Sequence, residues 1–136
     1  MYSETYQVKV ADLGYYGNEK QIDILADQYE DHFELKTEVD GVSFEAEADD
    51  MFSAFQLLRD KMLKSSWGIK CNAARINAVQ SGMMRDQNVV YLVELGKQAR
   101  NENIHGFWDY CELEEYVYTE EQEIFRKKWM ESLKNQ

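Results

Sequence analysis

The chain has no proline, and only two cysteines and seven glycines occur among its 136 residues. Proline-rich and glycine-rich stretches are typical of linkers, so their absence favours one folded unit over several flexibly joined ones. No apolar run is long enough to span a bilayer, and no basic segment followed by an apolar one stands at the N-terminus. We therefore expect a cytoplasmic protein that does not bind membranes.

Cysteines and histidines are scarce as well. Cys71 and Cys111 are too few for a disulfide framework, which favours two buried thiols in a reducing compartment. With His32 and His105 they are the soft metal-ligand candidates, and none of the four shows the close pairing typical of structural zinc sites. The sequence thus predicts no metal and no cofactor, and histidines with surface or capping roles.

Positive charge is also in short supply, because the net charge is −11. It is unevenly spread: residues 61–100 carry a local net charge of +5, and the rest of the chain carries −16. A strongly acidic protein is not expected to bind duplex nucleic acid, which requires neutralisation of phosphates. Charge complementarity favours a cationic protein partner instead. The alternative is a solvated surface of mixed charge without a partner.

Alternation of apolar and polar residues is present through the first third of the chain. Runs around Val8, Ile24 and Leu35 have the two-residue period of strands, with turns expected at 16–18 and 28–31. Asp40-Gly41 predicts a two-residue hairpin loop. The expected cross-strand pairs are Val39 with Val42, Thr37 with Phe44 and Leu35 with Ala46. Residues 1–48 are therefore predicted to form a β-meander.

A first amphipathic helix is predicted over 50–65, capped by Asp49 or Asp50. Its apolar stripe consists of Met51, Ala54, Phe55, Leu58 and Met62. Gly68 is expected to end it in the left-handed conformation. Further strands are predicted within 69–118, including 69–75, 88–95 and a segment of 107–118.

A second amphipathic helix is predicted over 120–134. Thr119 and Gln122 match a capping box, and Glu123 and Lys127 are spaced to form an ion pair. Its buried stripe would be Phe125, Trp129 and Leu133. Residues 1–136 are thus predicted to form a single α+β domain, an antiparallel sheet of about five to seven strands with both helices covering one face. Tyr15-Tyr16 and Phe107-Trp108 are expected in its core.

The segment 71–86 is where an apolar pattern gives way to a polar, cationic loop, and it is the candidate ligand or partner site. Its candidate binding residues are Asn72, Arg75, Ser81, Gly82, Met83 and Arg85. Arginine offers bidentate hydrogen bonds to an anion, and loop N–H groups can add to them. The alternative is that Arg75 and Arg85 pair with acids such as Asp86 or Glu94.

Several short motifs stand between Phe55 and Leu133. They are Leu58-Arg59, Trp67, Cys71-Asn72-Ala73-Ala74-Arg75, Ser81-Gly82-Met83 with Arg85, Tyr91-Leu92-Val93-Glu94-Leu95-Gly96-Lys97, Glu121-Gln122, and Trp129 with Ser132-Leu133. With these motifs the chain resembles a family of small uncharacterised bacterial proteins. It departs from the family pattern at Val79-Gln80, where the family has an aromatic residue and a proline, and before Tyr91, where the family is rich in glycine. The resemblance implies no activity and points to the 71–86 loop.

No complete catalytic motif is present. Ser81 lacks the preceding glycine of a nucleophile elbow, and no phosphate-binding glycine loop occurs. We therefore expect a non-enzymatic protein-binding module, a monomer or homodimer, acidic enough to neutralise a cationic partner as immunity proteins do. One alternative is a small-molecule or anion-binding enzyme that uses the 71–86 segment, with Arg75, Ser81, Arg85 and Cys71 lining the site. A nucleophilic pair there would require Cys71 or Cys111 beside His105 or His32. The other alternative is a homodimeric structural protein.

Overall fold

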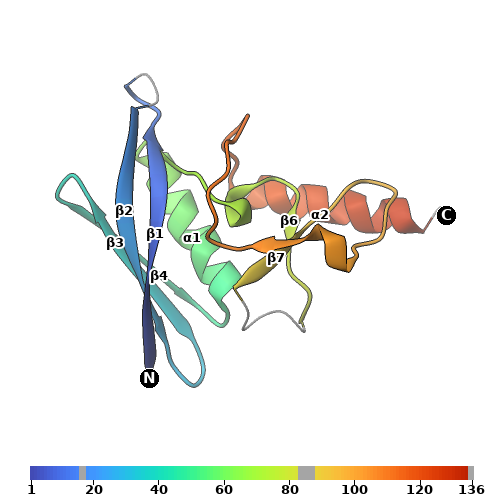
Figure 1. The fold of residues 1–136 in the computed structure, drawn as a ribbon, viewed down its shortest axis with the longest axis horizontal. Helices are drawn as coiled ribbons and strands as arrows, with labels where there is room; N and C mark the ends of the chain where they lie inside the picture. Colours follow the sequence, from blue (N-terminus) through green and yellow to red (C-terminus); the bar gives the residue numbers. More distant parts are fainter. Residues whose placement is uncertain (16–17, 83–87, 135–136) are drawn as a thin grey trace.

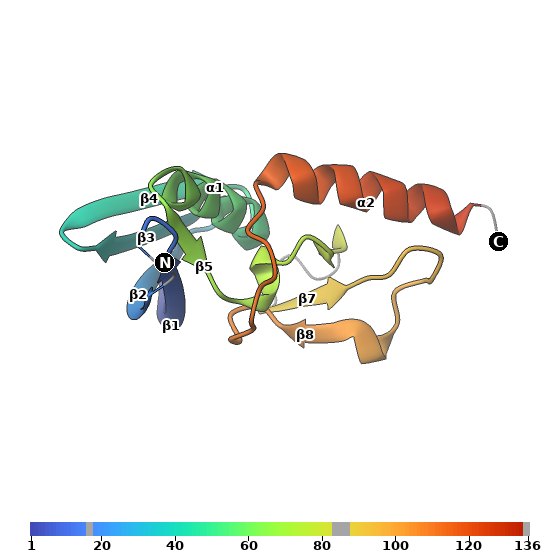
Figure 2. The ribbon, with the colours of Figure 1, turned by 90° about the horizontal axis from the view of Figure 1, so that it is seen from above.

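The computed structural model describes residues 1–15, 18–82 and 88–134. Within them, five antiparallel strands form the larger sheet, in the spatial order β4-β3-β2-β1-β5. Figure 1 labels the first four of these strands, and Figure 2 labels β5. These strands are β1 (Tyr2–Asp12), β2 (Asn18–Gln28), β3 (Phe33–Val39), β4 (Val42–Ala48) and β5 (Trp67–Ile69). Two long helices accompany the sheet, α1 (Met51–Lys64) and α2 (Thr119–Leu133). The predicted α+β fold is therefore confirmed.

The β3–β4 hairpin has the register that the sequence predicts. All three expected pairs are present, from Val39 opposite Val42 to Leu35 opposite Ala46. Asp40 and Gly41 both have positive φ, 51° and 80°, as a type I′ turn requires. The turn expected at 28–31 also forms, whereas Tyr16 and Gly17 lie outside the described residues.

Helix α1 covers the inner face of this sheet (Figure 2). The Asp50 carboxylate caps it by accepting a hydrogen bond from the Ser53 N–H at 2.8 Å. All five residues of the predicted stripe are buried, and they pack on strand residues such as Ile24 and Leu35. The helix ends differently from the prediction, because Ser66 adopts the left-handed conformation at φ 66°.

Gly68 has another role. It lies inside β5, where an added Cβ would stand 2.4 Å from the Tyr116 ring. The glycine at this position therefore leaves room for an aromatic side chain packed on the strand rather than a helix terminus.

The predicted strand 69–75 is largely wrong. Strand β5 ends at Ile69, and a 3₁₀ turn, η1 (Asn72–Ala74), follows. The reason is that the backbone here pairs with a loop: the Ala73 N–H donates to the Phe107 carbonyl, at 3.1 Å. A second, smaller antiparallel sheet of the described residues then forms in the order β6-β7-β8. Its strands are β6 (Ala78–Val79), β7 (Val89–Leu92) and β8 (Ile104–Gly106).

The segment 107–118 is not a strand in the structure, which corrects the prediction. Phe107 and Trp108 instead turn into the core, as expected of them, and join an aromatic cluster with residues of the larger sheet and α1. Trp108 stacks on Tyr6 at 4.8 Å between ring centroids, and Phe107 meets Phe55 edge to face at 5.3 Å. Tyr15, by contrast, is 66% exposed, so its predicted core position is wrong.

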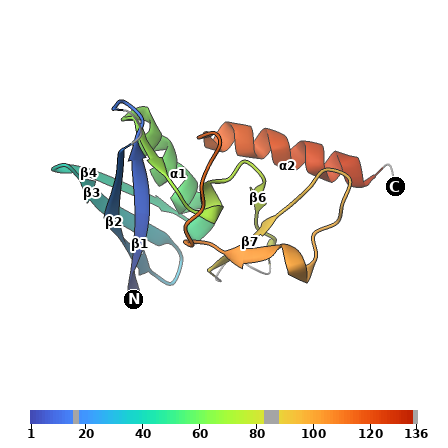
Figure 3. The ribbon, with the colours of Figure 1, turned by 45° about the horizontal axis from the view of Figure 1, so that its top comes forward.

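Helix α2 departs most from its sequence pattern. It lies beside the smaller sheet and the loop after β7, so the two helices do not cover one common face (Figure 3). Phe125, Trp129 and Leu133 are half-buried rather than buried. Glu123 pairs with Arg126, three residues along the helix, and not with Lys127. None of the described helices is long and apolar enough to cross a membrane.

Candidate functional site

The structure separates the candidate residues of the 71–86 segment. Asn72 and Arg75 belong to the η1 turn and its end, where Asn72 is buried. Ser81 and Gly82 are exposed after β6. Met83 and Arg85 lie outside the described residues. The four described candidates therefore occupy two different places.

Asn72 and Arg75 hold the interior together. The Asn72 amide donates to the Gly106 carbonyl at 3.0 Å, and its oxygen accepts from Arg75 Nε at 3.4 Å. The Arg75 guanidinium also lies close enough to the Cys111 thiol to lower the pKa of that thiol. Glu94, one of the acids considered for Arg75, pairs with Lys97 at 2.7 Å. These contacts join η1 to the smaller sheet and describe a structural role.

Ser81 and Gly82 line a hollow of about 340 Å³ between the starts of the two helices. The cation in its wall is Arg126, whose Nε donates to both carboxylate oxygens of Glu123 at 3.1 Å. Because the Arg126 guanidinium is already paired with a carboxylate, the described part of the hollow has no strong binding group for an anion.

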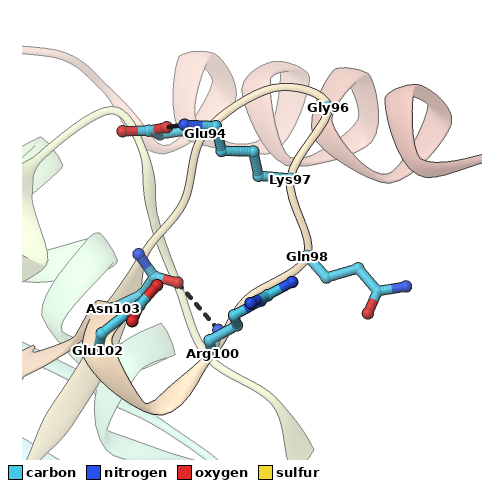
Figure 4. A pocket seen from close by; sticks show the side chains of 7 residues that line it. All are labelled: Glu94, Gly96, Lys97, Gln98, Arg100, Glu102 and Asn103. Atoms are coloured by element: carbon cyan, nitrogen blue, oxygen red, sulfur yellow. Dashed lines mark hydrogen bonds and ion pairs between the residues drawn. The ribbon is translucent and has the colours of Figure 1, made fainter. Parts of the chain in front are cut away.

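A larger hollow, of about 680 Å³, lies in the loop after β7 (Figure 4). Its lining is polar: Glu94, Gly96, Lys97, Gln98, Arg100, Glu102 and Asn103. Figure 4 shows these side chains spread around an open loop, with Gln98 directed away from the others. Ligand pockets are mostly apolar with a few converging polar groups, so this hollow lacks the usual features of one.

Gln122 and Arg59 form a buried polar network that the sequence did not reveal. Each is 2% exposed. The Gln122 oxygen accepts from Arg59 Nη2 at 2.5 Å, and its amide donates to the carbonyls of Ala73 and Arg75 at 3.0 and 2.8 Å. Burial lowers the pKa of Arg59, opposed by its hydrogen bond to Asp60.

The predicted capping box is therefore wrong. The Thr119 N–H donates to the Asp60 carboxylate at 2.9 Å, and Gln122 faces inward instead of bonding back to the helix start. The spacing of Thr119 and Gln122 is compatible with a capping box and with the observed contacts. The sequence pattern alone could not show that Arg59 and Asp60 of α1 lie beside the start of α2. Farther along α2, Trp129 donates to the Lys97 carbonyl at 2.8 Å.

The two thiols are poorly placed for nucleophilic chemistry. Cys71 is completely buried, and burial raises its pKa to about 12. Burial also raises the pKa of Cys111, against the lowering effect of Arg75. A nucleophilic cysteine needs the thiolate form, which these environments disfavour.

The outer face of β2, β3 and β4, on the side away from α1, is the most strongly charged surface among the described strands. We call it the acidic face. Alternate residues of these strands point to it, and they include seven acids and one lysine: Glu19, Asp23, Asp27, Glu34, Glu38, Glu45, Glu47 and Lys36. Of these acids, Glu19 is already paired with Lys70. The segment after Trp108 lies over β5 and the neighbouring part of β1, where Tyr116 is near Gly68 and Tyr110 near Lys9.

His32, Glu34 and Glu47 come together at one end of the acidic face. Their potential ligand atoms all lie within 4.8 Å of one another. The predicted hairpin register already implied that Glu34 and Glu47 stand opposite each other, and the pairing confirms it. That register does not predict that His32, in the turn before β3, lies beside these two glutamates.

No protein-family model matches the chain, and a search of curated proteins returned no match.

Proposed function

We propose that the protein binds a cationic protein through its acidic face, as an immunity protein does when it neutralises a basic toxin. The observation that carries the proposal is the ratio of seven carboxylates to one lysine on the outer face of three adjacent strands. Opposite charges on two surfaces speed their encounter and reject partners of the wrong sign.

The placement of these acids favours binding over a structural role. Asp23, Glu38, Glu45 and Glu47 are exposed, so their charges can reach a partner. The inner face of the same strands is already filled by α1, which leaves the outer face for contacts with other molecules. A sheet face dominated by carboxylates repels nucleic acid phosphates, in keeping with a protein partner.

Charge reversal on this face tests the proposal. We expect the immobilised wild-type protein to retain a basic protein from its host extract at low salt and to release it at high salt, because exposed charges are screened. The triple variant Asp23→Lys, Glu38→Lys and Glu45→Lys should lose this retention. The control variant Glu102→Lys, Glu114→Lys and Glu115→Lys changes the net charge equally at exposed positions elsewhere and should keep it.

Two outcomes would contradict the proposal. Equal loss of retention in both triple variants would show that net charge, and not the acidic face, draws basic proteins. Recovery of the protein alone, as a dimer by light scattering that the acidic-face variant disrupts, would assign the face to self-association instead.

A further inference from the structure

The ligand atoms at the end of the acidic face have the spacing of a metal site. His32 Nε2 lies 3.6 Å from a Glu34 carboxylate oxygen and 3.9 Å from a Glu47 oxygen. Two donors bound tetrahedrally at about 2.1 Å from one zinc ion stand about 3.4 Å apart. The two distances from His32 exceed this value by a few tenths of an ångström, and all three donor atoms lie within 4.8 Å of one another, so side-chain rotations of about 1 Å would bring them onto one ion.

The imidazole of His32 is oriented in the way that metal-bound histidines usually are. Its Nδ1 lies 2.6 Å from the Asp31 carboxylate, which leaves Nε2 facing the two glutamates. Metal-bound histidines generally donate their second ring nitrogen to a carboxylate or carbonyl in this way. The ring also stacks on Tyr29, with 4.5 Å between centroids and 4° between planes, so its rotation is restricted.

The two glutamates form an unfavourable pair unless a cation lies between them. Glu34 and Glu47 stand directly opposite each other on β3 and β4, and like charges in that relation are destabilising. The next outward pair along the same strands, Lys36 opposite Glu45, has opposite charges.

We propose that His32, Glu34 and Glu47 bind a divalent first-row transition metal ion, of which Zn²⁺ is the best fit. One imidazole and two carboxylates suit zinc and its neighbours, whereas magnesium and calcium take oxygen ligands. Asp31 is a positioning residue that holds the ring. With three protein ligands, a tetrahedral ion has its fourth position open to water or to a partner's side chain. The proposal does not depend on protein binding by the acidic face.

Calorimetric titration of the intact protein with ZnCl₂ tests the site. We expect one ion per chain, and a loss of affinity of at least about tenfold in His32→Ala and in the isosteric Glu34→Gln and Glu47→Gln. The control Glu38→Gln with Glu45→Gln removes two charges from the same strands and face outside the triad, and should bind as the wild type does. MgCl₂ should give no saturable binding at His32.

A second readout separates a real site from general attraction of cations to acids. Titration with CoCl₂ should produce the visible absorption of a cobalt ion with nitrogen and carboxylate ligands, and His32→Ala should abolish it while His105→Ala leaves it unchanged. Asp31→Ala should weaken zinc binding by about tenfold without changing its stoichiometry. Absence of saturable binding up to about 1 mM Zn²⁺, or binding unaffected by His32→Ala, would overturn the proposal.

Discussion

The two helices show how differently the two halves of the molecule are built. Helix α1 buries six residues, five of them apolar, against the five-stranded sheet, and all of its predicted stripe lies in the core. Helix α2 buries one residue, the polar Gln122, and leaves Ile124 and Met130 48% exposed each. The first half, residues 1–69, contributes most of the apolar core, whereas the second half, residues 70–134, adds fewer residues to it, among them Ala73, Val90 and Phe107. Helix α2 is joined to α1 mainly through the buried hydrogen-bond network.

The largest expected difference between the two helices is in the cost of removing a phenylalanine side chain from each. Phe55→Ala in α1 is expected to lower the free energy of unfolding by about 3–5 kcal/mol, because the ring is fully buried and its removal leaves a cavity. Phe125→Ala in α2 removes a half-buried ring and should cost clearly less. Urea denaturation followed by circular dichroism measures both, and equal costs would show that the halves are equally packed.

The buried network is the next test, since it connects α2 to α1. Gln122→Ala would remove a donor from the carbonyls of Ala73 and Arg75 and an acceptor from Arg59. Arg59 keeps Asp60 and Thr119, and the Arg75 carbonyl keeps the Ala78 N–H, so the expected cost is that of one unsatisfied buried group, about 1–3 kcal/mol. The control Gln56→Ala removes a half-buried amide that donates to the same Gln122 oxygen, and should cost less.

Hydrogen exchange would show where the Gln122→Ala loss falls. We expect amides of α2 and the smaller sheet to lose protection before those of β1 to β4, because the network joins the second half to the first. A uniform loss throughout the chain would contradict this view of the network as a connection between halves.

The same contrast explains how much of the fold and of the candidate site the sequence could predict. In β1 to β4 and α1, the local sequence period determines which side chains face the core. A two-residue or 3.6-residue period was therefore sufficient to predict the buried faces and the pairing of Leu35 with Ala46. In the second half the deciding partners lie far away in the sequence: Gln122 has the spacing of a local cap, but it bonds to Arg59 and to the carbonyls of Ala73 and Arg75.

The candidate site follows the same rule. Asn72 and Arg75 looked available for a ligand because their partners, the Gly106 carbonyl and Cys111, lie more than thirty residues away. The opposition of Glu34 and Glu47 could be predicted, because it follows from a local hairpin. The approach of His32 to both of them could not, since it depends on how the turn before β3 is folded.

The reactivities of the two thiols provide a further comparison of the two halves, because Cys71 and Cys111 lie in different parts of the molecule. Cys71 belongs to the main core, whereas Cys111 lies in the irregular segment that leads to α2. We expect iodoacetamide at pH 8 to label Cys111 at least about tenfold faster than Cys71, since labelling requires local opening and a thiolate. Mass spectrometry of the peptides measures both rates. Equal rates would indicate that the halves open as one unit.

The smallest expected effect is a contribution of Cys71 to the loss of stability at alkaline pH. In the unfolded chain this thiol loses its proton near pH 9, but in the folded protein burial raises its pKa to about 12. Between these values the unfolded state binds fewer protons than the folded one, so stability falls as pH rises, by up to about 1.4 kcal/mol per pH unit. From pH 8 to pH 10, Cys71→Ala should lose about 1 kcal/mol less than the wild type.

Tyr6, whose pKa burial also raises to about 12, titrates in both proteins, so the difference isolates the thiol. A variant whose stability falls as steeply as that of the wild type would mean that solvent reaches Cys71 in the folded protein.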